Sequence, residues 1–134
     1  MTYEEHLAEV KEEHLAEVKK DGTSLTHIPE ELRTHEVCLA AVSQNGYALF
    51  YVPESQRTPE IYLAAVTQNG EALCHVPEAL KTPELCLVAV SQNGSALFWV
   101  PYELKTPELC LAAIHQNPTT VEYSPYSILE LMAF

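Results

Sequence analysis

Cysteine and histidine are the side chains of this sequence that could act as metal ligands or nucleophiles. The chain of 134 residues holds four cysteines and six histidines. No Cys-x-x-Cys or His-x-x-x-His pair occurs, and His6 and His14 stand eight residues apart on one predicted helix, too far apart to share an ion. Neither a glycine-rich phosphate loop nor a Gly-x-Ser-x-Gly turn is present. We therefore expect no metal site, no cofactor and no catalytic residue.

A second set of side chains could bind a partner without doing chemistry. One position carries a ring at a constant interval along the chain, and this ring column consists of His27, Tyr51, His75, Trp99 and Tyr123. Exposed rings at a variable position are typical of protein interfaces. The alternative is a stack of rings that seals successive short helices against each other. Neighbouring variable positions would add a mixed aromatic and acidic rim, which includes Tyr47, Glu71 and Tyr102.

The interval between the rings is the period of the chain. The stretch AVSQNG at 41–46 returns as AVTQNG at 65–70, as AVSQNG at 89–94 and as AIHQNP at 113–118, always at the same spacing. A pair of short helices of this length cannot bury its own apolar residues, so successive units must stack. The repetition predicts an all-α fold, a short α-solenoid of tandem 24-residue helix-turn-helix repeats.

Each unit carries its own signals for the start and end of a helix, as in 58–81, TPEIYLAAVTQNGEALCHVPEALK. Thr58 is suited to cap a helix, and Pro59 to occupy its first position. The next six residues are apolar on all sides, which predicts an inner helix buried between neighbouring repeats. We expect this helix to end with Gly70 in the left-handed conformation.

The second half of the unit is expected to be a shorter helix with one apolar face, formed by Ala72, Leu73 and Val76. Before it, glutamine at positions 44, 68, 92 and 116 and asparagine at 45, 69, 93 and 117 form two polar columns. Stacked amides could grip a peptide backbone, or they could satisfy the open backbone groups where each inner helix ends. The structural role is favoured, because invariance suits a joint between repeats.

Three cysteines, Cys38, Cys86 and Cys110, share one repeat position with Tyr62. A position that accepts tyrosine in place of cysteine is a packing position, and thiols in an apolar helix are inert. We expect reduced thiols and a cytoplasmic protein, or one in the host cytosol if it is a secreted effector.

The ends of the chain are expected to close the array as one domain, 1–134. Residues 1–33 would form an N-terminal cap and a degenerate repeat, and the octet EEHLAEVK, written twice, would extend the first helix. Full repeats would follow at 34–57, 58–81 and 82–105, and 106–134 would hold the last repeat and a C-terminal capping helix.

The net charge of −12 limits the choice of partner. Seven Lys and Arg cannot form a strong basic face, so we expect no direct nucleic-acid binding. No apolar run approaches the ~18 residues of a membrane helix. The charge favours a soluble monomer. Ten of the nineteen acidic residues lie in residues 1–36, and the face they form includes Glu4, Glu5, Glu12 and Glu13.

The pattern TPE[LI]-x-L-x-AV-[ST]-QNG-x-AL-x-x-VP resembles the repeats called domain of unknown function 4116, over about residues 22–117. Such repeats occur in tandem in proteins of intracellular bacteria and of protists, some of them suspected effectors. The resemblance implies a helical repeat without an assigned activity, and it brings no catalytic or binding residues.

Three functions follow from these features. The first is a non-enzymatic, effector-like repeat module whose ring column binds another protein. The second is an acidic inhibitor or decoy that imitates nucleic acid and occupies a basic cleft on a protein. The third is an enzyme accessory or a fragment of a larger effector, with the chemistry in other segments.

Overall fold

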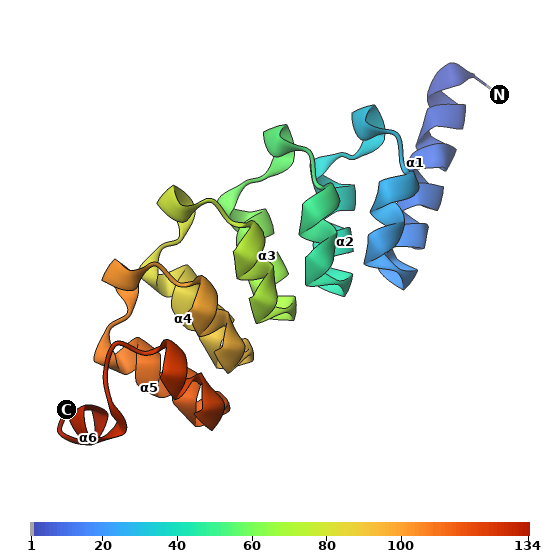
Figure 1. Ribbon diagram of the computed structural model, residues 1–134. Coiled ribbons are helices and arrows are strands. Elements are labelled where there is room, and N and C mark those ends of the chain that lie inside the picture. Colours follow the sequence, from blue (N-terminus) through green and yellow to red (C-terminus); the bar gives the residue numbers. More distant parts are fainter. Residues whose placement is uncertain (1) are drawn as a thin grey trace. The chain divides into compact units, whose positions relative to one another are not determined.

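The computed structural model describes residues 2–134, and the chain divides into two compact units, Met1–Gln68 and Asn69–Phe134. Every regular element within residues 2–134 is a helix (Figure 1). Within each unit the repeats lie side by side, with the longer α-helices in one layer and 3-10 helices in the other. The predicted all-α fold of tandem repeats is confirmed.

The first unit contains α1 (Tyr3–Lys20), η1 (Gly22–His27), η2 (Glu30–Leu32), α2 (His35–Gln44), η3 (Gly46–Tyr51), η4 (Glu54–Gln56) and α3 (Pro59–Gln68). The second contains η5 (Gly70–His75), η6 (Glu78–Leu80), α4 (Pro83–Gln92), η7 (Gly94–Trp99), η8 (Tyr102–Leu104), α5 (Pro107–Gln116), η9 (Pro118–Tyr123) and α6 (Ile128–Met132). In the first unit α2 packs against both α1 and α3, and η1 packs against η3. In the second unit α4 packs against α5, and η7 packs against both η5 and η9.

The inner helices begin as the sequence predicts. The Oγ1 atoms of Thr58, Thr82 and Thr106 accept the backbone N–H three residues later, at 3.3, 3.1 and 3.2 Å. A proline is the first residue of α3, α4 and α5. Each cap satisfies a donor that has no partner inside the helix, and proline at this position removes another such donor.

The helices do not end in the predicted way. No residue in 2–134 has a positive φ, so the expected left-handed Gly70 is wrong. Instead, the backbone of Asn69 is extended, with φ −149°. Its Oδ1 accepts the backbone N–H of Glu71 at 3.0 Å, and this hydrogen bond caps the start of η5. Glycine is required because a Cβ on Gly70 would collide with the carbonyl oxygen of Ala89 in α4.

The glutamine column joins each repeat to the one before it. The N–H of Gly70 donates to Oε1 of Gln92 at 2.5 Å, and the N–H of Gly94 donates to Oε1 of Gln116 at 2.5 Å. The first unit has the equivalent pairs, Gly22 with Gln44 and Gly46 with Gln68, both at 2.6 Å. Since the asparagines cap the 3-10 helices, both polar columns have the structural role that the sequence favoured.

The core lies between the two layers. Ala72, Leu73 and Val76 are buried, as predicted. The expectation that the inner helix is buried on all sides is wrong, because the leucine at one position faces solvent in each of α3, α4 and α5. The exposed fractions are 48% for Leu63, 46% for Leu87 and 41% for Leu111. Neighbouring helices and the 3-10 layer cover only part of each inner helix.

The doubled octet forms a single helix of 18 residues, α1, with a capping box between Thr2 and Glu5 at its start. Of its apolar residues, Val18 is buried and Leu15 is half-buried. At the other end α6 is a short helix capped by Ser127, and it buries Leu131. No helix in the part of the chain that the structure describes is long and apolar enough to cross a bilayer.

Candidate protein-binding surface

Basic side chains hold the backbone of the ring column. The ammonium or guanidinium of one repeat donates to the carbonyl of the ring residue in the next: Arg33 to Tyr51 at 2.8 Å, Lys81 to Trp99 at 2.8 Å and Lys105 to Tyr123 at 2.9 Å. Each carbonyl belongs to the last residue of a 3-10 helix, where the peptide dipoles favour a cation. The basic column consists of Arg33, Arg57, Lys81 and Lys105. Three of them, Arg33, Lys81 and Lys105, are part of the joint between repeats, and the guanidinium of Arg57 donates to the carbonyl of Val52 in its own repeat at 3.0 Å.

In the first unit the rings gather on η3. Tyr51 is half-buried and meets Phe50 edge to face, with ring centres 5.4 Å apart. Phe50 is 63% exposed and Tyr47 is 47% exposed. Because Tyr47 and Phe50 are three residues apart on a 3-10 helix, their side chains lie on the same side of that helix. His27, on η1, is exposed.

In the second unit the rings form a tighter group. Phe98 contacts Trp99 and Tyr123 edge to face, with ring centres 4.9 and 5.3 Å apart. Trp99 Nε1 donates to Oε2 of Glu71 at 3.4 Å, so the structure brings together a ring-column residue and a residue of its predicted rim. His75, Trp99 and Tyr123 are all half-buried. The side chains therefore pack on their neighbours and still reach solvent.

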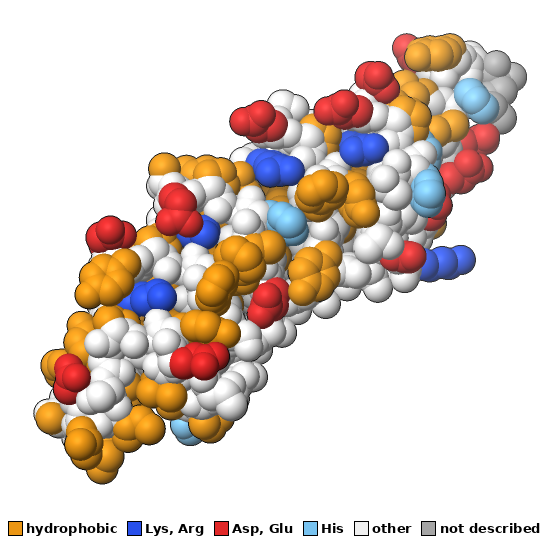
Figure 2. All heavy atoms as spheres, in the orientation of Figure 1, with side chains coloured by type: hydrophobic (Ala, Val, Ile, Leu, Met, Phe, Trp, Pro, Cys, Tyr) orange, Lys and Arg blue, Asp and Glu red, His pale blue; other side chains and the backbone are white. Residues whose placement is uncertain are grey.

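Two surface rings were missed by the sequence analysis, Phe50 and Phe98. They precede the ring column by one residue, at a position that holds Thr, Phe, Cys, Phe and Glu in successive repeats. Phe98 is 56% exposed. A phenylalanine at a variable position was the available signal. On the face shown in Figure 2, hydrophobic side chains lie among Asp and Glu side chains over both units.

The remaining predicted residues lie elsewhere. Tyr102 is on η8 and lines a hollow of about 330 Å³ with Pro125 and Tyr126. The acidic residues Glu4, Glu5, Glu12 and Glu13 are all exposed on α1, which also carries Lys11, Lys19 and Lys20.

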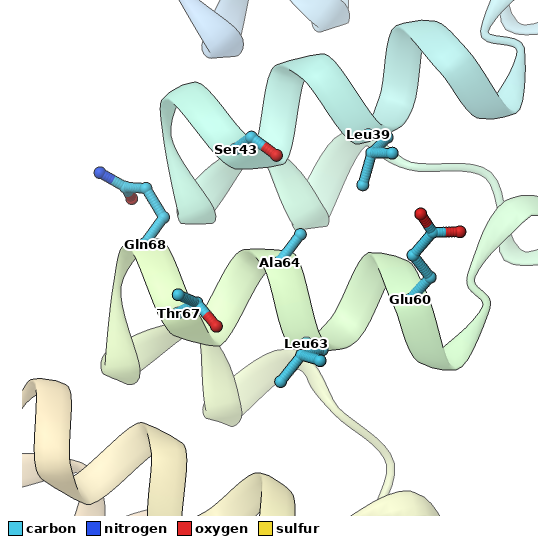
Figure 3. Close-up of a pocket in the computed structure, with 7 residues that line it drawn as sticks. All are labelled: Leu39, Ser43, Glu60, Leu63, Ala64, Thr67 and Gln68. Carbon is cyan, nitrogen blue, oxygen red and sulfur yellow. The ribbon is translucent and has the colours of Figure 1, made fainter.

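A shallow groove of about 360 Å³ lies in the α-helical layer between α2 and α3 (Figure 3). Leu39 and Leu63 give it an apolar floor, and Glu60 is its one titratable residue. The Glu60 carboxylate lies 3.2 Å from Nε2 of His35 in an exposed pair. His35 does not line the groove, so Glu60 is the one lining side chain that could act as an acid or a base there.

The repeated cysteines lie in the core. Cys38, Cys86 and Cys110 are fully buried, and Tyr62 fills the same position with 5% exposed. Burial raises the pKa of Cys38 and of Cys86 to about 11, although Arg33 and Lys81 oppose the shift. These thiols are protonated at neutral pH, which disfavours a nucleophilic role. Within residues 2–134 no cluster of His, Cys, Asp and Glu could hold a metal ion.

We expect thiol reagents at pH 8 to modify Cys74 in the folded protein and to spare Cys38, Cys86 and Cys110. Cys74 is half-exposed, and its pKa is raised by burial and by the charge of Glu71. Because the thiolate reacts, a raised pKa makes labelling slow at pH 8 and faster as the pH rises. Mass spectrometry after timed labelling measures this order. The control is unfolded protein, in which all four cysteines react. Rapid labelling of Cys86 in the folded protein would contradict the prediction.

These features define a class of protein, the helical tandem repeats in which fixed residues make the joints and variable residues make the surface. The chain belongs to the family described as Domain of unknown function (DUF4116), which matches residues 18–57, 58–105 and 82–129. The last two matches are each two repeats long and are offset by one repeat, so they share the repeat at 82–105. Neither a curated protein nor a solved structure matches the chain.

Proposed function

We propose that this chain is a non-catalytic helical repeat module that binds another protein through the rings of its 3-10 layer. The observation that carries the proposal is the exposure of Phe50 and Phe98 beside the half-buried Tyr51 and Trp99. Large exposed aromatic side chains are costly to leave in water, and aromatic residues are enriched in the energetic centres of interfaces.

The contrast with the fixed positions supports this assignment. The repeated glycines, glutamines and asparagines have their polar groups engaged within or between repeats, as does the basic column. The residues of the ring column contribute their backbone carbonyls to that joint. Because every residue has a backbone carbonyl, the joint does not require a particular side chain at this position, and the side chain can vary as a surface that recognises a partner requires.

A second candidate function is the acidic decoy, and one observation favours it. Four of the seven basic residues form the basic column, whose side chains are bound to backbone carbonyls. The remaining three, Lys11, Lys19 and Lys20, lie on α1 among its glutamates. Much of the acidic charge is thus left without a compensating cation, which would favour a basic protein surface.

The two candidates respond differently to substitution. We expect the double variant Trp99→Ala, Tyr51→Ala to weaken binding to the protein partner at least about tenfold, because two aromatic anchors are removed. Quantitative pull-down with the wild type and the variant identifies the proteins lost. Tyr3→Ala, which removes an exposed ring of α1, is the matched control and should change little.

A decoy would give the opposite result. Its complex would survive the ring substitutions, would weaken steeply with salt and would be lost when Glu4, Glu5, Glu12 and Glu13 become glutamine. A partner that is retained by both sets of variants would contradict both proposals.

A further inference from the structure

The second unit carries a ring-and-carboxylate cluster, which consists of Glu71, Phe98, Trp99, Glu122 and Tyr123. The planes of Trp99 and Tyr123 meet that of Phe98 at 87° and 76°. In an edge-to-face pair the edge of one ring meets the face of the other, and the face of an aromatic ring is its negative pole. Trp and Tyr are the rings that attract cations most strongly.

Two carboxylates border these rings. Glu71 lies within hydrogen-bonding distance of the Trp99 indole. The pKa of Tyr123 is raised by its hydrogen bond with Glu122 and the charge of that carboxylate, and further by the charge of Glu71. Both negative charges therefore act on one aromatic group.

Within residues 69–134, the lysine ammonium groups are bound to atoms other than the carboxylates of this group. This part of the chain holds seven Glu and only two such basic residues, Lys81 and Lys105. The ammonium groups of both lysines are bound to the backbone carbonyls of Trp99 and Tyr123, and Lys81 also pairs with Glu78. Among the described residues, neither Glu71 nor Glu122 is in an ion pair with Lys or Arg.

We infer that the ring-and-carboxylate cluster binds an arginine side chain presented by a segment of the protein partner. A guanidinium is planar and weakly hydrated, so it stacks on an aromatic face and donates to a carboxylate at the same time. The rings supply the stacking surface, and Glu71 and Glu122 supply acceptors and negative charge. The inference rests on the proposed function and adds the chemistry of the partner.

The first unit offers a natural comparison. Its rings Phe50 and Tyr51 are also edge to face, but the residue equivalent to Glu71 is Thr23. An aromatic group without this carboxylate should bind cations more weakly. The arginine site is therefore assigned to the second unit alone.

Trp99 is the only tryptophan of the chain, so its fluorescence reports on the cluster directly. The probes are a capped glycine peptide with two arginines, the same peptide with citrulline, which keeps the shape without the charge, and a lysine version. We expect the arginine peptide to change Trp99 emission at a concentration at least about tenfold lower than the citrulline peptide, with lysine between them. Added salt should weaken the arginine response.

Glu71→Gln should weaken the arginine response about fivefold or more, because the ring cluster loses a charged acceptor. Glu108→Gln removes the same charge from an exposed position in the first turn of α5 and should change the response less than about twofold. Circular dichroism establishes that both variants are folded.

The result that overturns the inference is an equal response to arginine and citrulline, or no response to either. Equal responses would still leave a ring surface that binds peptides, so the proposed function would stand. That function fails on a different result, namely a partner retained by the Trp99→Ala, Tyr51→Ala variant.

Discussion

Replacing Gly70 by alanine is expected to lower the free energy of unfolding by about 2–3 kcal/mol, because the new methyl group collides with a neighbouring backbone. The obstacle is the carbonyl oxygen of Ala89, which belongs to a helical hydrogen-bond ladder and cannot rotate away. A flexible side chain could yield at little cost. A helix can yield only by moving away from η5.

Two opposing effects decide the magnitude. Gly70 has an ordinary negative φ, so alanine would reduce the entropy of the unfolded chain and stabilise the fold by about 0.4–1 kcal/mol. Displacement of α4 would also stretch the bond from Gly70 N–H to Gln92, whose loss costs about 1 kcal/mol. The steric penalty and the lost hydrogen bond together exceed the entropic gain.

Urea unfolding followed by circular dichroism measures the change. The matched control is Pro118→Ala, since Pro118 holds the same repeat position, is exposed and has no N–H to donate. It should change the free energy of unfolding by less than about 1 kcal/mol. A Gly70→Ala protein as stable as the wild type would show that the repeats are not packed as closely as the structure has them.

The features that depend on local chemistry were predictable from sequence. The Thr-Pro pair fixes the start of α3, α4 and α5, because the threonine caps the helix and the proline ring fixes the first backbone angle whatever surrounds them. The burial of Ala72, Leu73 and Val76 follows from their spacing on one face. The period itself revealed the stacking, because a 24-residue pair of helices has no core of its own.

The features that depend on the neighbouring repeat were not predictable in the same way. Glycine after a helix usually marks a left-handed turn, but Gly70 is selected by the approach of α4. Basic residues are usually solvated, so the basic column was counted only as charge, although it recurs with the period of the repeat. The burial of these basic residues was not predicted, and it is clearest at Lys81, which is only 6% exposed to solvent.

The ring column could be found in the sequence from its period, but the side chains that contact the rings could not be predicted. The contact of Phe98 with Tyr123 joins side chains of adjacent repeats, and the distance between these side chains depends on how the repeats are joined. The pairing of Glu71 with Trp99 spans 28 residues, one period and four residues more. Such contacts follow from the geometry of stacking and have no signature in one repeat.

Substituting Lys81 by methionine is expected to lower the free energy of unfolding by about 2–3 kcal/mol, because the Trp99 carbonyl loses a charged donor. Lys81 Nζ donates to that carbonyl at 2.8 Å and to Oε1 of Glu78 at 2.6 Å. Glu78 is 71% exposed, so its ion pair is worth at most about 1 kcal/mol. Most of the loss must come from the carbonyl, and Glu78→Gln should therefore be nearly neutral.

A competing effect makes this experiment informative. Burying an ammonium is costly, and replacing a buried ion by an apolar side chain of similar volume can be neutral or stabilising. A neutral or stabilising outcome requires that the acceptor is also removed or becomes hydrated. Lys81→Met removes the ammonium but leaves the carbonyl of the 3-10 helix in place. Lys81→Arg is the conservative control, because Arg33 bonds the equivalent carbonyl of Tyr51. If the arginine variant is stable and the methionine variant loses stability, the basic column is a joint between repeats. If both variants match the wild type, the cost of desolvating the ammonium cancels the gain from its hydrogen bond, and the joint rests on Gly70 and Gln92.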